Sequence, residues 1–231
     1  MGDHMGIIVA IEGGDGAGKA TAAANLVACL EQAGHSAALM SFPRYAETVG
    51  GHVLGVFLSG QLPHPVTPQT AAVLYALDRL ESAEALAAQV AAHDVVVLDR
   101  YIASNIAYQA AKVPGDGTGA LIDWIVRLET VQFALPLPDL TIYLDTPLDM
   151  ARALILRKRP RSYTEREYDE HEADVALQAR VRDVYAALAQ ATVLGRWETV
   201  RTVHDGAMRT PGAIAREIAD HVLPLLERLP G

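Results

Sequence analysis

Five short apolar runs, rich in β-branched residues, alternate with longer Ala- and Leu-rich segments along this chain. The runs span residues 7–11, 36–42, 94–99, 140–145 and 198–203. Strands that alternate with helices in this way form βαβ units, in which a mostly parallel sheet is covered by helices on both faces. The pattern therefore predicts an α/β fold.

Several residues mark the expected ends of helices. Threonine is a favoured N-cap and proline is tolerated in the first helical turn, so Thr-Pro dipeptides indicate helix starts. Three such dipeptides occur: Thr67-Pro68, Thr146-Pro147 and Thr210-Pro211. Gly34 is placed to end the helix that follows residue 18, because glycine commonly terminates helices.

Composition limits the kind of protein and its compartment. The 231 residues are 51% hydrophobic and 20% charged, which is typical of a globular chain. We find no apolar stretch long enough to cross a membrane and no signal peptide, and Cys29 is the only cysteine. These features favour a cytoplasmic protein. No linker or repeat divides residues 7–231, which we interpret as a single domain, and residues 1–6 as an N-terminal extension or cloning remnant.

The net charge of −9 argues against a broad nucleic-acid-binding surface, which requires a basic face. Any site for a polyanion must therefore be local.

The strongest local signal is the segment GGDGAGKAT at residues 13–21. It nearly matches the phosphate-binding pattern G-x-x-x-x-G-K-[ST], but Ala20 stands where a hydroxyl is expected. An apolar strand ending in Glu12 precedes it and a helical pattern follows. Backbone N–H groups and the helix N-terminus would cradle phosphates there, and Lys19 would reach the outer ones. The alternative is an ordinary glycine-rich turn.

A second signal is VVVLDRY at residues 95–101. This strand places Asp99 at the carboxyl edge of the sheet, where open α/β folds bind ligands and where P-loop proteins use an aspartate near magnesium. Arg100 beside it can hold a phosphate. The alternative is that Asp99 caps the next helix.

Two helical faces could present polar groups to a ligand. Tyr75, Asp78 and Arg79 lie at i, i+3 and i+4 on one expected helix, and Asn105 and Tyr108 share a face of another. The alternative is that the tyrosines belong to the core and the polar groups to the surface.

Six cations lie within fifteen residues of this otherwise acidic chain: Arg152, Arg157, Lys158, Arg159, Arg161 and Arg166. A basic flap of this kind can close over transferring phosphates and exclude water. The alternative is a helix whose basic last turn complements its dipole. The eight histidines show no metal-ligand spacing.

Taken in order, IEGGDGAGK, FPR (42–44), YALDR, LDRYIASNIAY and PDLTIYLD resemble the bacterial type of thymidylate kinase, a P-loop nucleoside monophosphate kinase family. The resemblance implies a five-stranded parallel sheet flanked by helices, with a short basic lid at about residues 157–168, and usually a homodimer. It implies transfer of the γ-phosphate of ATP to dTMP with Mg²⁺. Other deoxynucleotide or deoxynucleoside kinases, or a nucleotide-dependent switch protein, are the alternatives.

The resemblance also assigns roles to positions. The expected ATP-binding residues are Gly13, Gly14, Asp15, Gly16, Ala17, Gly18, Lys19, Ala20 and Thr21. The expected dTMP-binding residues are Asp15, Phe42, Arg44, Tyr75, Arg79, Arg100, Asn105 and Tyr108. The expected catalytic residues are Asp15, Lys19, Arg100, Arg159 and Arg166. The expected metal-binding residues are Asp15, Asp99 and Glu172, with Asp169 as second choice to Glu172.

Within the dTMP set, Arg44 and Arg100 would hold the phosphate and Tyr75 would stack on thymine. Arg79 and Asn105 would hydrogen-bond the base, and Tyr108 would crowd the position of a ribose 2′-hydroxyl. Thr21 cannot replace the hydroxyl missing at Ala20, because the next helical residue is rotated by about 100°.

Overall fold

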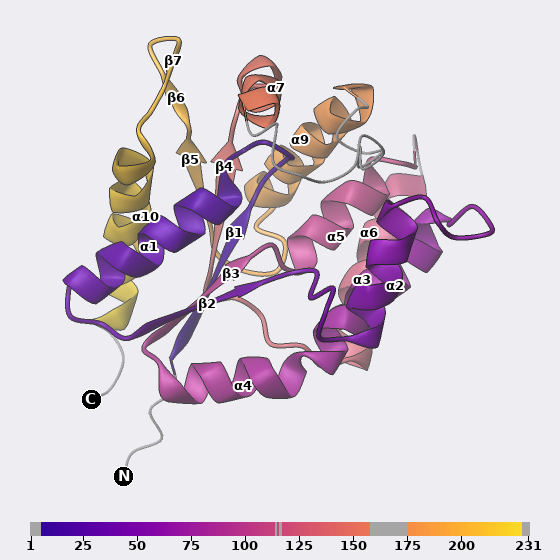
Figure 1. The fold of residues 1–231 in the computed structure, drawn as a ribbon, viewed down its shortest axis with the longest axis horizontal. Helices are drawn as coiled ribbons and strands as arrows, with labels where there is room; N and C mark the ends of the chain where they lie inside the picture. Colours follow the sequence, from indigo (N-terminus) through magenta and orange to yellow (C-terminus); the bar gives the residue numbers. More distant parts are fainter. Residues whose placement is uncertain (1–5, 114, 116, 158–174, 228–231) are drawn as a thin grey trace.

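A five-stranded parallel sheet forms the centre of the molecule, with strand order β2–β3–β1–β4–β5 (Figure 1). The computed structural model describes residues 6–113, 115, 117–157 and 175–227. The strands are β1 (Ile7–Glu12), β2 (Ala37–Ser41), β3 (Val95–Asp99), β4 (Leu140–Asp145) and β5 (Trp197–Arg201). All four strand pairings are parallel, so the predicted five-stranded sheet is confirmed. Arg159, Arg166, Glu172, Asp169 and most of the expected lid lie outside the described residues.

Helices cover both faces of the sheet. They are α1 (Lys19–Gln32), α2 (Val49–Leu58), α3 (Pro68–Glu81), α4 (Ala83–Ala92), α5 (Ile102–Ala110), α6 (Gly117–Arg127), η1 (Leu128–Gln132), α7 (Leu148–Arg157), α9 (Val175–Gln190) and α10 (Pro211–Leu226). A hairpin of β6 (Val203–His204) and β7 (Ala207–Met208) precedes α10. In Figure 1, α1 and α10 lie together on one side of the sheet, and α3, α5, α6 and α9 lie on the other. None of the helices in the described ranges is long and apolar enough to span a membrane.

A hydrophobic core lies on each face of the sheet, and β1 contributes side chains to both because successive residues of a strand point to opposite faces. Ile7, Val9 and Ile11 join the cluster that contains the buried residues of α1 and α10. Ile8 and Ala10 join the cluster formed with α5 and α9. A strand buried on both faces is apolar throughout rather than alternating, which explains the continuous run IIVAI.

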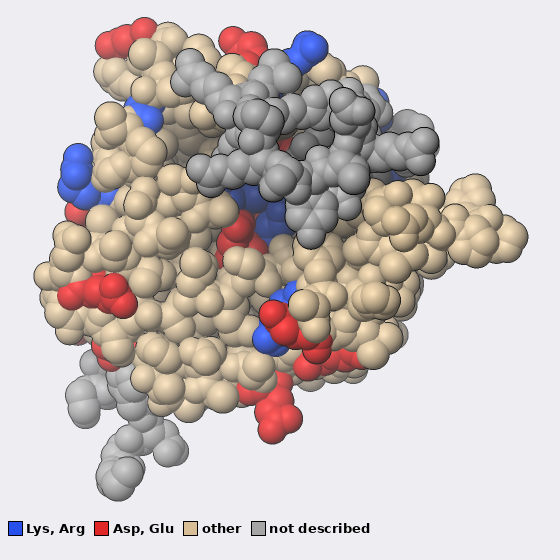
Figure 2. Space-filling model, viewed as in Figure 1, with Lys and Arg blue, Asp and Glu red and all other residues tan. Residues whose placement is uncertain are grey.

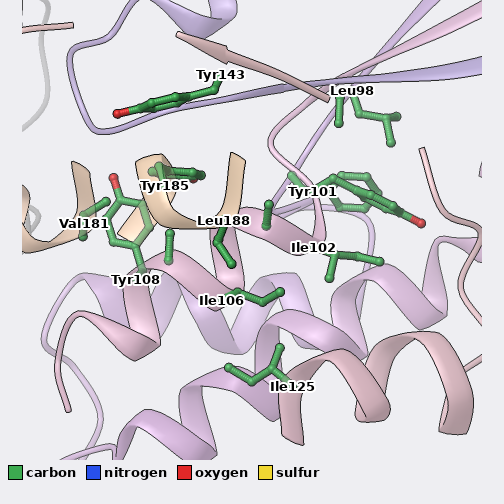
Figure 3. Close-up of a cluster of buried hydrophobic side chains, with 14 of the residues drawn as sticks. Leu98, Tyr101, Ile102, Ile106, Tyr108, Ile125, Tyr143, Val181, Tyr185 and Leu188 are labelled. Carbon is green, nitrogen blue, oxygen red and sulfur yellow. The ribbon is translucent and has the colours of Figure 1, made fainter. Parts of the chain in front are cut away.

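The core on the α5 and α9 side contains aromatic rings (Figure 3). Tyr143 of β4 stacks on Tyr185 of α9, with ring centroids 5.5 Å apart and an interplanar angle of 17°. A stacked aromatic pair contributes roughly 0.5–1.5 kcal/mol beyond the burial of its area, so this contact helps to hold α9 against the sheet.

Two of the three predicted Thr-Pro helix starts are confirmed. The hydroxyls of Thr67 and Thr210 accept hydrogen bonds from backbone N–H groups three residues later, at the starts of α3 and α10. The third differs, since α7 begins at Leu148 rather than at Pro147. The Thr146 hydroxyl instead contacts the Ala17 carbonyl and the Thr202 hydroxyl, because the end of β4 lies against the loop after β1.

Gly34 ends α1 as expected. Its φ of 92° lies in the left-handed region, and the N–H of His35 returns to the carbonyl of Leu30. This arrangement satisfies carbonyls at the helix end that would otherwise lack donors.

The carboxylate of Glu12, at the end of β1, is fully buried and accepts four hydrogen bonds. Its Oε1 accepts from the backbone N–H groups of Tyr101 (2.8 Å) and Ser104 (3.2 Å). Its Oε2 accepts from the hydroxyls of Ser104 (2.6 Å) and Tyr185 (2.9 Å). One side chain thus joins β1, the start of α5 and α9.

We expect Glu12→Ala to lower the free energy of unfolding by roughly 3–5 kcal/mol, because it leaves buried donors without an acceptor at about 1–3 kcal/mol each. Urea denaturation followed by circular dichroism measures the change. Glu31→Ala, on the exposed surface of α1, is the control and should change it by about 0.5 kcal/mol or less. A loss below about 1 kcal/mol for Glu12→Ala would contradict this account.

Candidate active site

The loop between β1 and α1 has the geometry of an anion-binding turn. Gly16 and Gly18 adopt φ values of 75° and 88°, and Gly18 is the N-cap of α1. At Gly16 a Cβ would lie 2.3 Å from the Ala151 carbonyl oxygen, so the loop passes too close to α7 for any side chain. The loop leads directly into the N-terminus of a helix, where N–H groups and the helix dipole favour negative charge.

Lys19 is the cation of this loop. Its Nζ donates to the carbonyl oxygens of Gly13 (3.0 Å) and Gly14 (2.7 Å). Burial, with the positive charge of Arg100, lowers the pKa of Lys19 to about 8, although nearby Asp15 and Asp99 oppose the shift. The ammonium is therefore held close to the loop backbone and is protonated at neutral pH.

Asp15 is held by two partners that come from different elements. One carboxylate oxygen pairs with Nη2 of Arg100, and the other accepts from Nε2 of Gln178 on α9 at 2.7 Å. The backbone N–H of Asp15 also donates to Oε1 of Gln178 at 3.2 Å. Burial alone would raise the pKa of Asp15, but Arg100 and Lys19 together lower it to about 2, so this carboxylate is ionised at neutral pH.

Arg100 follows β3 with a φ of 67°, in the left-handed region that residues other than glycine rarely adopt. Its backbone N–H donates to the carbonyl of Ile11, and its guanidinium carbon lies 5.3 Å from the centroid of the Tyr108 ring. Unusual backbone conformations of this kind cluster at functional sites. Here the conformation directs a cation toward the loop.

A cavity beside the loop, which we call the aromatic cavity, combines rings with cations. It is lined by Asp15, Phe42, Pro43, Tyr45, Leu58, Tyr75, Arg79, Arg100, Ser104 and Tyr108. The structure therefore brings together all but two of the residues expected to bind dTMP. Acidic and basic side chains also gather near the centre of the face shown in Figure 2.

Arg44 and Asn105 do not line the aromatic cavity in this structure. Nε of Arg44 donates to Glu47 at 2.7 Å, near the surface. The backbone N–H of Arg44 donates to the buried carboxylate of Asp78, which also accepts from the hydroxyl of Thr48. Asp78 thus holds the turn before α2, rather than presenting a charge to a ligand.

Asn105 is buried on the same face of α5 as Tyr108. Its amide contacts the carbonyl of Ala72 and the carboxylate of Glu129.

A second cavity, the hairpin cavity, lies on the other side of the loop. It is lined by Gly16, Ala17, Gly18, Thr21, Ala22, Leu144, Leu154, Met208, Arg209, Pro211 and Ile214. Both Ala20 and Thr21 are exposed, and of the two only Thr21 lines this cavity. The phosphate-binding loop therefore lies between two cavities, one rich in aromatic rings and one largely apolar.

Among the described residues, no group of three His, Cys, Asp or Glu side chains could hold a metal ion. One observation fits a hard cation nonetheless: Oδ1 of Asp99 is buried without a hydrogen-bond partner in the described part of the chain. Magnesium prefers such oxygen ligands and keeps several waters. Glu172 lies outside the described residues.

Three site residues escaped the sequence reasoning: Glu12, Gln178 and Glu129. Glu12 carried a signal, since a carboxylate directly after a buried apolar run needs donors from elsewhere. Gln178 and Glu129 carried no such signal, because their partners are distant in the sequence. The partner of Gln178 is Asp15, 163 residues away. The partners of Glu129 are Arg79 and Asn105, 50 and 24 residues away.

Comparison with known proteins agrees with this geometry. The family model described as thymidylate kinase matches residues 11–204. Thymidylate kinase of Mycobacterium tuberculosis (strain H37Rv) is 36% identical over 221 residues, covering 94% of this chain and 100% of that protein. Thymidylate kinase of Clavibacter michiganensis is 34% identical over 192 residues, covering 80% and 82%. The solved structure of thymidylate kinase from Candida albicans has the same fold, with a TM-score of 0.70 and 22% identity over 96% of this chain and 92% of that one. The chain belongs to the thymidylate kinase family.

Proposed function

We propose that this protein transfers the γ-phosphoryl group of ATP to dTMP, giving ADP and dTDP. The observation that carries the proposal is the position of the phosphate-binding loop between two cavities. dTMP occupies the aromatic cavity, and the nucleoside of ATP occupies the hairpin cavity, where Thr21 meets the α-phosphate. Both phosphate chains then meet at the loop, beside Lys19 and Arg100.

The aromatic cavity suits a nucleotide with a flat base. Tyr75 and Phe42 offer ring faces for the base, and Arg100 offers a cation for the phosphate. Arg44, which pairs with Glu47 outside the lining of this cavity, would turn toward the phosphate to join it. Tyr108 lies under Arg100 and crowds the sugar on the side of the 2′ position, which favours a deoxyribose.

The chemistry requires positioning more than proton transfer. An oxygen of the dTMP phosphate attacks the γ-phosphorus, the bond from that phosphorus to the β,γ-bridging oxygen breaks, and ADP leaves. The attacking phosphate has a second pKa near 6 and is already anionic at neutral pH, so no strong general base is needed. Lys19 and Arg100 stabilise the charge on the transferring oxygens, and Arg159 and Arg166 add to it.

Mg²⁺ is the expected cofactor, and Asp15, Asp99 and Glu172 would hold it directly or through waters. When bound, the ion neutralises charge on the donor phosphates. The carboxylate of Asp15 already pairs with Arg100 and Gln178. We therefore expect Asp15 to hold the ion through a water molecule rather than directly.

We also propose a homodimer, as the family resemblance implies. Exposed large apolar side chains on Val73, Trp124 and Val131 support an association surface on the α3, α6 and η1 side. The protein acts in the cytoplasm as a single catalytic domain of residues 7–231.

The substrate proposal predicts a specific pattern of activity. A coupled assay of ADP release should show turnover with dTMP well above that with dUMP, dGMP, dAMP or thymidine. Equal rates with all five acceptors, or a preference for thymidine, would contradict it. ATP hydrolysis without any acceptor would indicate a nucleotide switch instead.

The metal proposal predicts unequal effects of two substitutions. Ala20→Ser should change kcat by about threefold or less, because the carboxylates hold the ion. Asp15→Asn should lower kcat/KM by about 100-fold, since it loses a charge-assisted pair of about 1.5–3 kcal/mol and a charge near the metal. Asp220→Asn, on the exposed surface of α10, is the matched control and should keep full activity. A large gain from Ala20→Ser would show instead that the site is impaired.

The lowered pKa of Lys19 predicts that kcat/KM for ATP falls at basic pH. Below about pH 8 Lys19 is protonated and attracts phosphate, and above it the charge is lost, so kcat/KM for ATP should fall about tenfold per pH unit. The pH at which kcat begins to fall should be higher than that for kcat/KM, because bound phosphates keep the Lys19 ammonium charged. Any activity retained by Lys19→Arg should not fall at basic pH in this way, since arginine stays protonated. Steady-state rates from pH 6.5 to 10 test this, and a kcat/KM that stays flat would contradict it.

A further inference from the structure

One face of α9 holds the beginning of the phosphate-binding loop. Gln178 and Tyr185 lie seven residues apart on this helix, which places both side chains on the same face. The hydroxyl of Tyr185 donates to Glu12 at 2.9 Å, and the amide of Gln178 contacts Asp15. Helix α9 therefore contacts the chain on both sides of the first two glycines of the loop.

The orientation of the Gln178 amide follows from its two contacts. A backbone N–H can only donate, so the atom that accepts from the N–H of Asp15 at 3.2 Å must be the oxygen, Oε1. The other atom is then the nitrogen, Nε2, which donates to Oδ2 of Asp15 at 2.7 Å. Both side chains are buried, so these contacts are made largely away from water.

Gln178 lies on the far side of Asp15 from Arg100. Asp15 and Arg100 both line the aromatic cavity, and Gln178 is not among the residues that line it. Asp15 also lines a smaller cavity, which it shares with Gln178 and with Ala151 of α7, and Arg100 is not among the residues that line that one. A ligand in the aromatic cavity thus meets Asp15 and Arg100, and Gln178 can act on the ligand through Asp15.

The geometry of Asp15 determines how much of the Arg100 guanidinium is left for a ligand. A carboxylate that uses both oxygens pairs with a guanidinium through two parallel hydrogen bonds, which is a strong and specific arrangement. Here Gln178 takes Oδ2 of Asp15, and the contact with Arg100 runs from Nη2 to Oδ1. Arg100 is therefore oriented by Asp15 through one oxygen, and its side chain keeps an exposure of 24%.

An amide is suited to holding Asp15 in this way. A cation in place of Gln178 would neutralise the Asp15 carboxylate, and a second carboxylate would repel it. Without the amide, both oxygens of Asp15 could turn toward Arg100. The resulting pair would compete with an acceptor phosphate for the same cation.

We propose that Gln178 is a positioning residue for binding of the acceptor phosphate: by holding one oxygen of Asp15, it leaves Arg100 available to a phosphate in the aromatic cavity. This role rests on the proposed function, because it requires the phosphate of dTMP to lie beside Arg100. Gln178 acts through Asp15 and does not itself contact the substrate.

The first test measures binding rather than turnover. Gln178→Met keeps the length of the side chain and removes both contacts with Asp15. Isothermal titration calorimetry in EDTA, where no metal ion contributes, should show dTMP binding weakened about 10-fold or more, the loss expected for a charge-assisted hydrogen bond. The affinity for thymidine, which carries no phosphate, should stay within about twofold.

A second variant separates the two contacts of the amide. Gln178→Glu retains an oxygen that can accept from the N–H of Asp15, but it loses the donor to Oδ2 and brings two carboxylates together. It should weaken dTMP binding at least as much as Gln178→Met does, again without a change for thymidine. If Gln178→Glu binds dTMP as the wild-type protein does, the amide holds only the backbone of the loop, and the proposal is overturned.

The matched control is Gln190→Met, the same substitution at the last residue of α9. Gln190 is exposed, so this variant should keep the wild-type affinity for dTMP and for thymidine. Melting temperatures show whether each variant is folded. If Gln178→Met weakens dTMP and thymidine equally, or weakens neither, Gln178 does not act on the phosphate and the proposal is overturned.

A double-mutant cycle tests the route through Asp15. In a protein that carries Asp15→Asn, Gln178→Met should change the dTMP affinity by less than about threefold, because a neutral side chain at position 15 cannot compete for Arg100 as a carboxylate does. Full weakening in that background would overturn the proposal. If the wild-type protein neither binds dTMP more tightly than thymidine nor phosphorylates it, the proposed function fails instead, so the two failures are distinguishable.

Discussion

The buried carboxylate of Glu12 is the interaction on which the rest of the site depends. It lies at the last residue of β1, directly before the phosphate-binding loop, and it holds the start of α5 and the Tyr185 hydroxyl of α9 through four hydrogen bonds. No cation pairs with it among those partners; neutral donors satisfy it instead. Because the loop begins at the next residue, its position relative to Arg100 and α9 follows from this one group.

Three charges then set the electrostatics of the loop. Asp15, Lys19 and Arg100 lie close enough to shift one another, so that Asp15 is fully ionised while Lys19 gives up its proton more readily than an exposed lysine. Gln178 of α9 completes the set by holding both the backbone and the side chain of Asp15. Asp15 is thus held in place by contacts from Arg100 on one side and from α9 on the other.

Sequence reasoning reached the parts of the fold and site that local pattern determines. The five strands, the glycine-dependent loop and the capping threonines at 67 and 210 follow from periodicity and from backbone chemistry within a few residues. The cavity residues Tyr75, Arg79, Arg100 and Tyr108 were singled out because they stand at a strand end or on helical faces, and the family resemblance then assigned them to dTMP. The contacts of Gln178 and Glu129 could not be found this way, since they join segments far apart in the chain and leave no periodic trace. Asp78 was placed on an interior helix face, yet its partners are the backbone N–H of Arg44 and the hydroxyl of Thr48, which a helical pattern does not show. The roles of Arg159, Arg166 and Glu172 stay predictions.

The π-helical turn η1, which carries Glu129, has a consequence for how this protein can change over evolution. Arg79, Asn105 and Glu129 share one hydrogen-bond network, so replacing any one of them leaves a buried charge or amide unpaired. Replacements at these three positions are therefore coupled, since a single replacement is penalised in folding until its partner also changes. Substitutions at any one of these three positions are expected to persist only together with a change at another, because each stepwise path passes through a less stable protein.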